Sequence, residues 1–169
     1  MPVTINGDGT ITGLSVGGLP DGIVDTDTLA NGAATQAKRT YSTGEIIQTV
    51  STTLTSASTS TLSTNGEITL MSRTYTPTLS SSNALIQVSL HLDLTGSYGG
   101  MFINLLRDST AFARGDAASN RRQVTIAPDL STSTFGGNLL GFTILDTGIS
   151  GTSEVTYKVN LLDQSGGGG

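Results

Sequence analysis

The sequence of 169 residues is long enough for one domain with a buried core and an additional arm. Its net charge of −5 makes a nucleic-acid phosphate backbone a poor partner, and the absence of cysteine excludes disulfide and thiolate chemistry. No apolar run approaches the roughly 20 residues of a membrane-spanning helix. The first residues lack the pattern of a signal peptide, so we expect synthesis in a cytoplasm and no membrane insertion. Only 12% of the residues are charged. Gly, Ser and Thr are abundant instead, which favours an all-β protein with tight turns.

Residues 1–24 alternate turn signals with short apolar pieces. The pieces Thr4-Ile5 and Thr10-Ile11, joined by the turn sequence NGDG, predict a small hairpin. Four further apolar residues lie between glycine-rich turns: Leu14, Val16, Leu19 and Ile23. A segment this short cannot bury these side chains by itself, so we expect it to lie on a neighbouring subunit or a larger assembly. The alternative is a solvated tail.

Residues 25–39 are the best helix candidate in the chain. Asp25 or Asp27 suits the N-cap, and Lys38 and Arg39 suit the negative end of the helix dipole. Three residues spaced four apart would share one face of this helix: Leu29, Ala33 and Ala37. A lone helix of this length is unstable. We therefore expect this face to contact other helices around an axis.

The segment from Tyr41 to Val50 predicts a return to β structure, with Ile46 and Ile47 as apolar anchors. Residues 51–64 are almost all serine or threonine. Threonine favours strands, so we predict a solvent-facing strand followed by a loop, with a disordered linker as the alternative.

The rest of the chain predicts a series of short strands. In Glu67 to Tyr75, alternation would place Ile68 and Met71 on opposite faces. The other expected strands are Leu85 to Leu94, Met101 to Leu106, Thr110 to Ala113, Arg121 to Ala127, Leu139 to Leu145 and Thr152 to Leu161. Seven or eight short strands after residue 45, separated by turns, predict an all-β fold: an antiparallel β-sandwich of the jelly-roll kind.

The sequence offers few residues for a catalytic or metal-binding site. His91, the single histidine, would share a strand face with Ser89 and Asp93. Side chains along one strand point in parallel, so a catalytic triad is not expected there. The NGDG turn and Asp25-Thr-Asp27 lack the ligand pattern of a calcium loop. We predict no enzymatic activity, no metal and no cofactor.

A charged loop follows the expected strand at Thr110. Its charged residues are Arg114, Asp116, Arg121 and Arg122. Together with Arg107 and Asp108 we expect them to form ion pairs near a turn or a subunit boundary. A basic patch that binds sugar or phosphate is the alternative.

Three stretches, LLRDSTAFARGDAASNRRQVT (105–125), GFTILDT (141–147) and SEVTYKVNL (153–161), resemble the β-sandwich head of phage tail-fibre and other virion surface proteins. Residues 10–38 are similar to the N-terminal segment of such proteins in marine phages. The chain departs from this pattern at its end. Relatives run on through further strands, whereas SGGGG follows residue 164 here.

The resemblance implies a homotrimer without enzymatic activity, assembled in the host cytoplasm and located on the virion. In this interpretation residues 1–40 form an arm and short helix that attach to other virion proteins. Residues 41–169 form the β-sandwich head, which lacks its last strands.

Two alternatives stay open. One is a capsid decoration protein. The other is a carbohydrate-binding module that uses the loops 95–100, 114–122 and 131–138, so a host-surface glycan or receptor is a further candidate partner.

Overall fold

The structure is a computed structural model. It describes residues 3–8, 11–13, 35, 39–56, 60–92, 101–119, 122–128 and 138–163. The chain divides into two compact units, Met1–Glu45 and Ile46–Gly169, which we describe one at a time.

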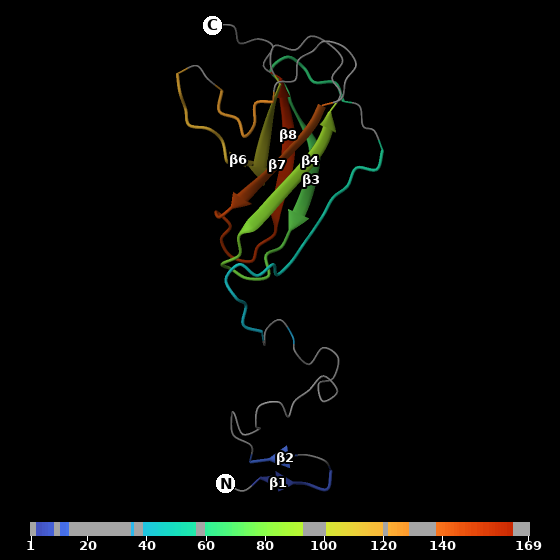
Figure 1. Cartoon of the computed structure of the whole chain (residues 1–169), viewed down its shortest axis with the longest axis vertical. Coiled ribbons are helices and arrows are strands. Elements are labelled where there is room, and N and C mark those ends of the chain that lie inside the picture. Colours follow the sequence, from blue (N-terminus) through green and yellow to red (C-terminus); the bar gives the residue numbers. More distant parts are fainter. Residues whose placement is uncertain are drawn as a thin grey trace. The chain divides into compact units, whose positions relative to one another are not determined.

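The first unit contains the predicted N-terminal hairpin. Strands β1 (Thr4–Ile5) and β2 (Ile11–Thr12) pair antiparallel, with Ile5 opposite Ile11 (Figure 1). The hairpin prediction is confirmed, with the second strand one residue later than expected. Both isoleucines are exposed, as is Val3. An isolated two-stranded hairpin is only marginally stable in water, and this one leaves its apolar side chains exposed.

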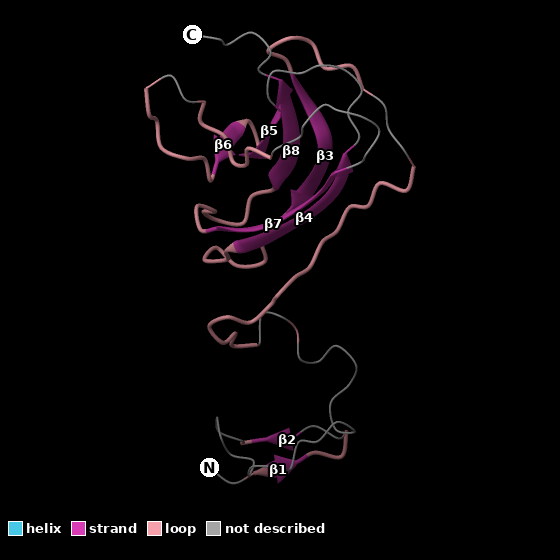
Figure 2. Cartoon of the chain, turned by 45° about the horizontal axis from the view of Figure 1, so that its top comes forward, coloured by secondary structure: helices cyan, strands magenta, loops and turns pink. Residues whose placement is uncertain are grey.

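The second unit contains two antiparallel sheets (Figures 1 and 2). The larger sheet has the order β3-β8-β5-β6 and the smaller one pairs β4 with β7. The strands of the larger sheet are β3 (Glu67–Tyr75), β8 (Val155–Asp163), β5 (Met101–Arg107) and β6 (Thr110–Phe112), and those of the smaller sheet are β4 (Ala84–Leu92) and β7 (Asn138–Asp146). These six elements confirm strands that alternation predicts, and the described residues contain no helix.

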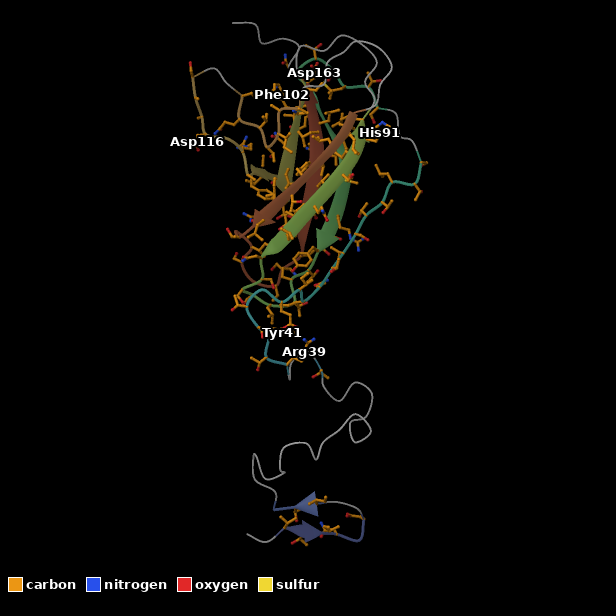
Figure 3. All side chains as sticks on the ribbon, viewed as in Figure 1. Arg39, Tyr41, His91, Phe102, Asp116 and Asp163 are labelled. Carbon is orange, nitrogen blue, oxygen red and sulfur yellow. The ribbon has the colours of Figure 1, made fainter. Side chains whose placement is uncertain are left out.

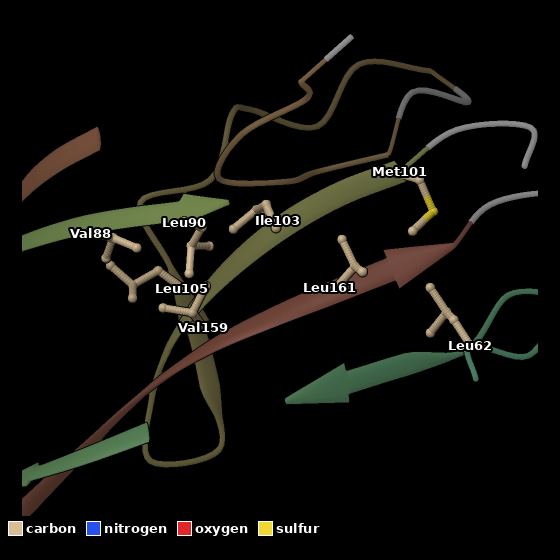
Figure 4. Close-up of a cluster of buried hydrophobic side chains, with 8 residues drawn as sticks. All are labelled: Leu62, Val88, Leu90, Met101, Ile103, Leu105, Val159 and Leu161. Atoms are coloured by element: carbon tan, nitrogen blue, oxygen red, sulfur yellow. The ribbon is translucent and has the colours of Figure 1, made fainter. Parts of the chain in front are cut away.

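A shared apolar core joins the two sheets. Val88 and Leu90 of β4 form one buried cluster with residues of β5 and β8 (Figure 4). At its centre, Ile103 and Leu105 are 0% exposed. Alternate residues of a strand point to opposite faces, so each strand contributes every second side chain to this cluster.

A β-bulge in β3 corrects one detail of the sequence prediction. Ile68 lies opposite Leu161 of β8, whereas Met71 lies opposite Val159, because the register shifts between Thr69 and Met71. Leu161 and Val159 share the core face of β8. The extra residue of the bulge therefore places Ile68 and Met71 on the same face, where alternation alone would separate them.

The predicted strands at 41–50 and within 51–64 are wrong, since residues 39–56 and 60–66 contain no strand. Among the described residues of these two ranges, Leu62 is the one buried in the core cluster. High β propensity does not form a strand without a paired edge, because propensity reflects packing against neighbouring strands. The predicted strand from Arg121 to Ala127 is reduced to a single bridge between Ile126 and Ile103.

The turn between β5 and β6 is attached to β8 by its own backbone. Asp108 has a φ of 57° and its N–H donates to the carbonyl of Thr156 at 2.7 Å. The N–H of Thr156 in turn donates to Asp108 Oδ1 at 2.9 Å. This reciprocal pair fixes the turn beside the end of β8 that lies next to Arg107.

Replacing Ala113 with glycine is expected to stabilise the protein. Ala113 follows β6 with a φ of 52°, a left-handed conformation that costs an L-residue about 1–2 kcal/mol. Glycine removes this cost but loses more chain entropy on folding. We expect Ala113→Gly to raise the free energy of unfolding by about 0.5 kcal/mol, measured by urea denaturation. A loss of stability would contradict the strain assigned to Ala113.

Candidate functional site

The outer face of the β4–β7 sheet is the most unusual surface in the described part of the chain. Leu85, Leu139 and Leu145 lie on it with 69%, 79% and 56% of their surface exposed. Leu85 lies directly opposite Leu145 in the register, so the two side chains form one cross-strand apolar pair. We call this outer surface the leucine face. Its other members are Gln87, Ser89, His91, Gly141 and Thr143.

The leucine face carries no Asp, Glu, Lys or Arg, although the whole chain has a net charge of −5. Scattered exposed leucines are ordinary on protein surfaces, but a paired set on one uncharged sheet face is typical of an interaction site. The strand alternation explains its position, since the alternate residues Val88 and Leu90 point into the core.

The edges of the two sheets differ in how they are protected. β3, at one edge of the larger sheet, has the bulge after Thr69 and the charged residues Glu67 and Arg73. β4 has none of these features: its nine residues pair with β7 without a register shift and include no Asp, Glu, Lys or Arg. Charges and bulges protect sheet edges from pairing with other chains. The edge of β4 lacks both devices.

A polar clamp holds the end of β7 on the larger sheet. Arg107 Nη1 donates to Asp146 Oδ1 and Oδ2 at 2.8 and 2.9 Å, and the Tyr157 hydroxyl donates to Asp146 Oδ2 at 2.8 Å. Asp146 also accepts a bond from the N–H of Gly148 at 2.8 Å. Its carboxylate is almost fully buried. We call Arg107, Asp146 and Tyr157 the clamp, which joins β5, β7 and β8 across the two sheets.

Aromatic contacts complete the surroundings of the clamp. The Arg107 guanidinium lies over the Phe112 ring, 5.7 Å from its centroid. The Phe112 and Tyr157 rings pack at a tilt with their centroids 6.0 Å apart. Arg107 and Tyr157 therefore take part in aromatic packing as well as in the bonds to Asp146. We therefore assign the clamp the role of positioning the β4–β7 sheet.

The clamp predicts a specific loss of stability at alkaline pH. Burial, followed by the hydrogen bond to Asp146, raises the pKa of Tyr157 well above its ordinary value of about 10. Because the folded-state pKa exceeds the unfolded one, this stabilisation is complete below about pH 10 and is lost as the pH rises above it. We expect Tyr157→Phe to be less stable by about 1 kcal/mol at pH 7. Above pH 10 its stability should fall less steeply with pH than that of the unmodified protein. Urea denaturation at pH 7 to 11 measures both, and parallel pH profiles would contradict the assignment.

The charged residues predicted to form ion pairs take different partners. Arg107 pairs with Asp146, which was not in the predicted set, and Asp108 bonds to the backbone of Thr156. Arg114 and Asp116 are exposed. Arg122 Nη1 donates to the carbonyl of Asp163 at 3.3 Å, while Arg121 lies outside the described residues. Within one chain, the described members of this set that have a recorded contact therefore bond to the backbone or to Asp146 of β7.

His91 is exposed at the end of β4 and lies away from Asp116 (Figure 3). Asp93, its predicted neighbour, lies outside the described residues. Across the part of the chain that is described, no three His, Cys, Asp or Glu side chains are grouped as metal ligands. That part also contains no helix with the length and hydropathy needed to cross a lipid bilayer.

The predicted interface of the N-terminal arm cannot be placed on the structure. All of its residues lie outside the described ranges: Leu14, Val16, Leu19, Ile23, Leu29, Ala33 and Ala37. The same holds for the predicted helix, except for Thr35 and Arg39, neither of which is helical. In this unit, Arg39 forms an ion pair with Glu45 and lies over the Tyr41 ring, 5.1 Å from its centroid (Figure 3).

Comparison of the chain with protein-family models, with curated proteins and with solved structures finds no match.

Proposed function

We propose that the two sheets of the second unit form a β-sandwich of the jelly-roll kind. The pairing of the strands supports this: β3 pairs with β8, and β4, the next strand along the chain, pairs with β7. Such nested pairs arise when an antiparallel ribbon folds over to form two facing sheets. The shared cluster of Val88 and Leu90 with β5 and β8 provides the core between the layers.

We further propose that the protein is a non-enzymatic structural component of a bacteriophage virion. It would be a homotrimeric tail-fibre or appendage protein that attaches through its N-terminal unit. The resemblance of residues 105–125, 141–147 and 153–161 to virion surface proteins suggests this role. The observation that carries the proposal is the leucine face, where the Leu85–Leu145 pair and Leu139 are left exposed on a single chain, on a surface without Asp, Glu, Lys or Arg. Such a surface is suited to burial between subunits.

The N-terminal hairpin fits the attachment role. Val3, Ile5 and Ile11 are exposed, and the register places Ile5 beside Ile11 on one face. Burying such side chains gains about 25 cal/mol per Å² of apolar surface. A groove on another virion protein would provide that burial.

Localisation on intact phage particles tests the proposal. Antibody–gold labelling of purified particles should place the protein at the tail or a vertex, with three copies per appendage. Labelling spread over the capsid shell at high copy number would replace the fibre assignment with a decoration protein. Absence from particles would overturn the virion proposal, and glycan-array binding by the isolated chain would then favour the carbohydrate-binding alternative.

A further inference from the structure

Residues 46–56 are extended but form no strand in the described structure (Figures 1 and 2). No backbone hydrogen bond joins them to any other described residue. Their one hydrogen bond to the described part is made by a side chain, from Thr78 Oγ1 to Gln48 Oε1 at 3.2 Å. The segment therefore presents the unpaired backbone groups that an edge strand would present.

The side chains of this segment place its aliphatic residues mainly on one face. Ile46, Val50 and Leu54 occupy even positions of an extended chain and share that face, with a polar residue between each successive pair. They are 80%, 36% and 54% exposed. The other face holds Ile47 followed only by serine and threonine, and the segment has no charged residue. Seven of its eleven residues are Ile, Val or Thr, the β-branched types that favour strands.

The open edge of β4 is complementary to this segment. It lacks the charges and the bulge that protect β3. On its inner face, Ile86 and Leu92 are only partly buried, although Val88 and Leu90 between them are buried. A further strand on this edge, with its apolar face turned inward, would extend the inner layer beside Ile86 and Leu92.

We propose that residues 46–56 of one copy of this chain pair with the open β4 edge of a second copy, as a donated strand. The inference rests on the proposed self-assembly and names a second contact between subunits, in addition to the leucine face. Eleven residues of extended chain span about 36 Å, enough for the nine residues of β4, which span about 30 Å. Because residues 46–56 carry no titratable side chain and β4 carries only His91, their close approach brings no like charges together.

Lysine substitutions in the donated strand give the first test. In Ile46→Lys/Leu54→Lys, both substituted positions are exposed in a single chain, so the fold should be retained. Pairing would bury the two charges, so association should weaken about tenfold or more, a change of about 1.4 kcal/mol or more. Ser109→Lys/Thr147→Lys is the matched control, with two charges added at exposed positions outside both segments. Sedimentation velocity over a range of concentrations measures association, and circular dichroism verifies folding.

Cysteine cross-linking gives the second test, because the natural chain has no cysteine. Ser51 is on the polar face of the donated strand and Ser89 is on the outer face of β4, so pairing brings both to one surface. A mixture of Ser51→Cys chains and Ser89→Cys chains should give mixed dimers under oxidising conditions. Repeating the mixture with Thr49→Cys and Thr53→Cys in place of Ser51→Cys allows for a shift of register.

The outcomes separate this inference from the proposed function. Strand donation between copies is supported if the lysine substitutions weaken association and the two cysteine variants form mixed dimers. Oligomers that are unaffected by the lysines, or that cross-link Ser51→Cys chains only to one another, overturn strand donation and leave the virion proposal standing. A protein that is monomeric at every concentration overturns strand donation and the homotrimer together, whereas particle labelling tests the virion location independently.

Discussion

Asp146→Ala is expected to lower the free energy of unfolding by about 3 kcal/mol. The substitution removes the acceptor of three donors, which are Arg107 Nη1, the Tyr157 hydroxyl and the Gly148 N–H. Losing one partner of a buried ion pair is costly because the other charge is left without compensation. Arg107 keeps 28% of its side-chain surface exposed, so water recovers part of this loss and the effect should lie at the lower end of the usual range.

Urea denaturation followed by circular dichroism measures the loss, at one fixed protein concentration because association also adds stability. Asp116→Ala is the matched control, since it removes the same charge from an exposed position. The control should change stability by less than about 0.5 kcal/mol. Equal effects of the two substitutions would show that the clamp does not hold the sheets together.

Asp146→Asn separates the charge from the shape of the clamp. The side chain keeps one acceptor oxygen in place of two, and it cannot neutralise Arg107. We expect the free energy of unfolding of Asp146→Asn to lie between that of the unmodified protein and that of Asp146→Ala. The same urea denaturation series measures this free energy. A loss as large as that of Asp146→Ala would assign the whole effect to the ion pair.

The sequence predicts most of the strands because their signal is local. Alternation of apolar and polar residues identifies β8, and the NGDG turn identifies the hairpin of β1 and β2. The same reasoning fails for residues 46–56. Their composition is that of a strand, but whether they pair depends on an edge that another part of the fold, or another chain, must provide. Local pattern also cannot locate the bulge after Thr69, which reverses the face of Met71.

The candidate site depends on contacts between distant residues, so sequence reasoning finds only parts of it. The pattern of Leu85, Val88 and Leu90 predicts a strand, yet nothing local shows that Leu145 lies opposite Leu85. Asp146 carries no motif, and its role arises because β7 ends beside Arg107 and Tyr157. The sequence predicts ion pairs among the charged residues near the β5–β6 turn, but Arg107 pairs with Asp146 of β7 and Asp108 bonds to the backbone of β8.

Leu105→Ala and Leu139→Ala make the same chemical change at two sites. We expect Leu105→Ala to lower stability and Leu139→Ala to weaken association between chains. Leu105 is fully buried in the cluster between the sheets, whereas Leu139 is 79% exposed on the leucine face. Truncation in the core removes transfer free energy and leaves a cavity, so we expect Leu105→Ala to cost about 3 kcal/mol of stability. In a single chain the exposed Leu139 side chain contributes little packing. Leu139→Ala should therefore lower the free energy of unfolding by less than about 0.5 kcal/mol.

For association between chains, Leu139→Ala should have the larger effect of the two substitutions. Leu139→Ala removes apolar surface from the proposed interface, so its oligomers should dissociate at a higher concentration than those of the unmodified protein. Leu105→Ala should keep its interface as long as it remains folded, because Leu105 reaches no surface. Urea denaturation and sedimentation velocity on both variants separate the two effects. If Leu139→Ala lowers stability at low concentration as much as Leu105→Ala does, then the leucine face is part of the fold of one chain. If Leu139→Ala changes neither property, then the leucine face is not a subunit interface.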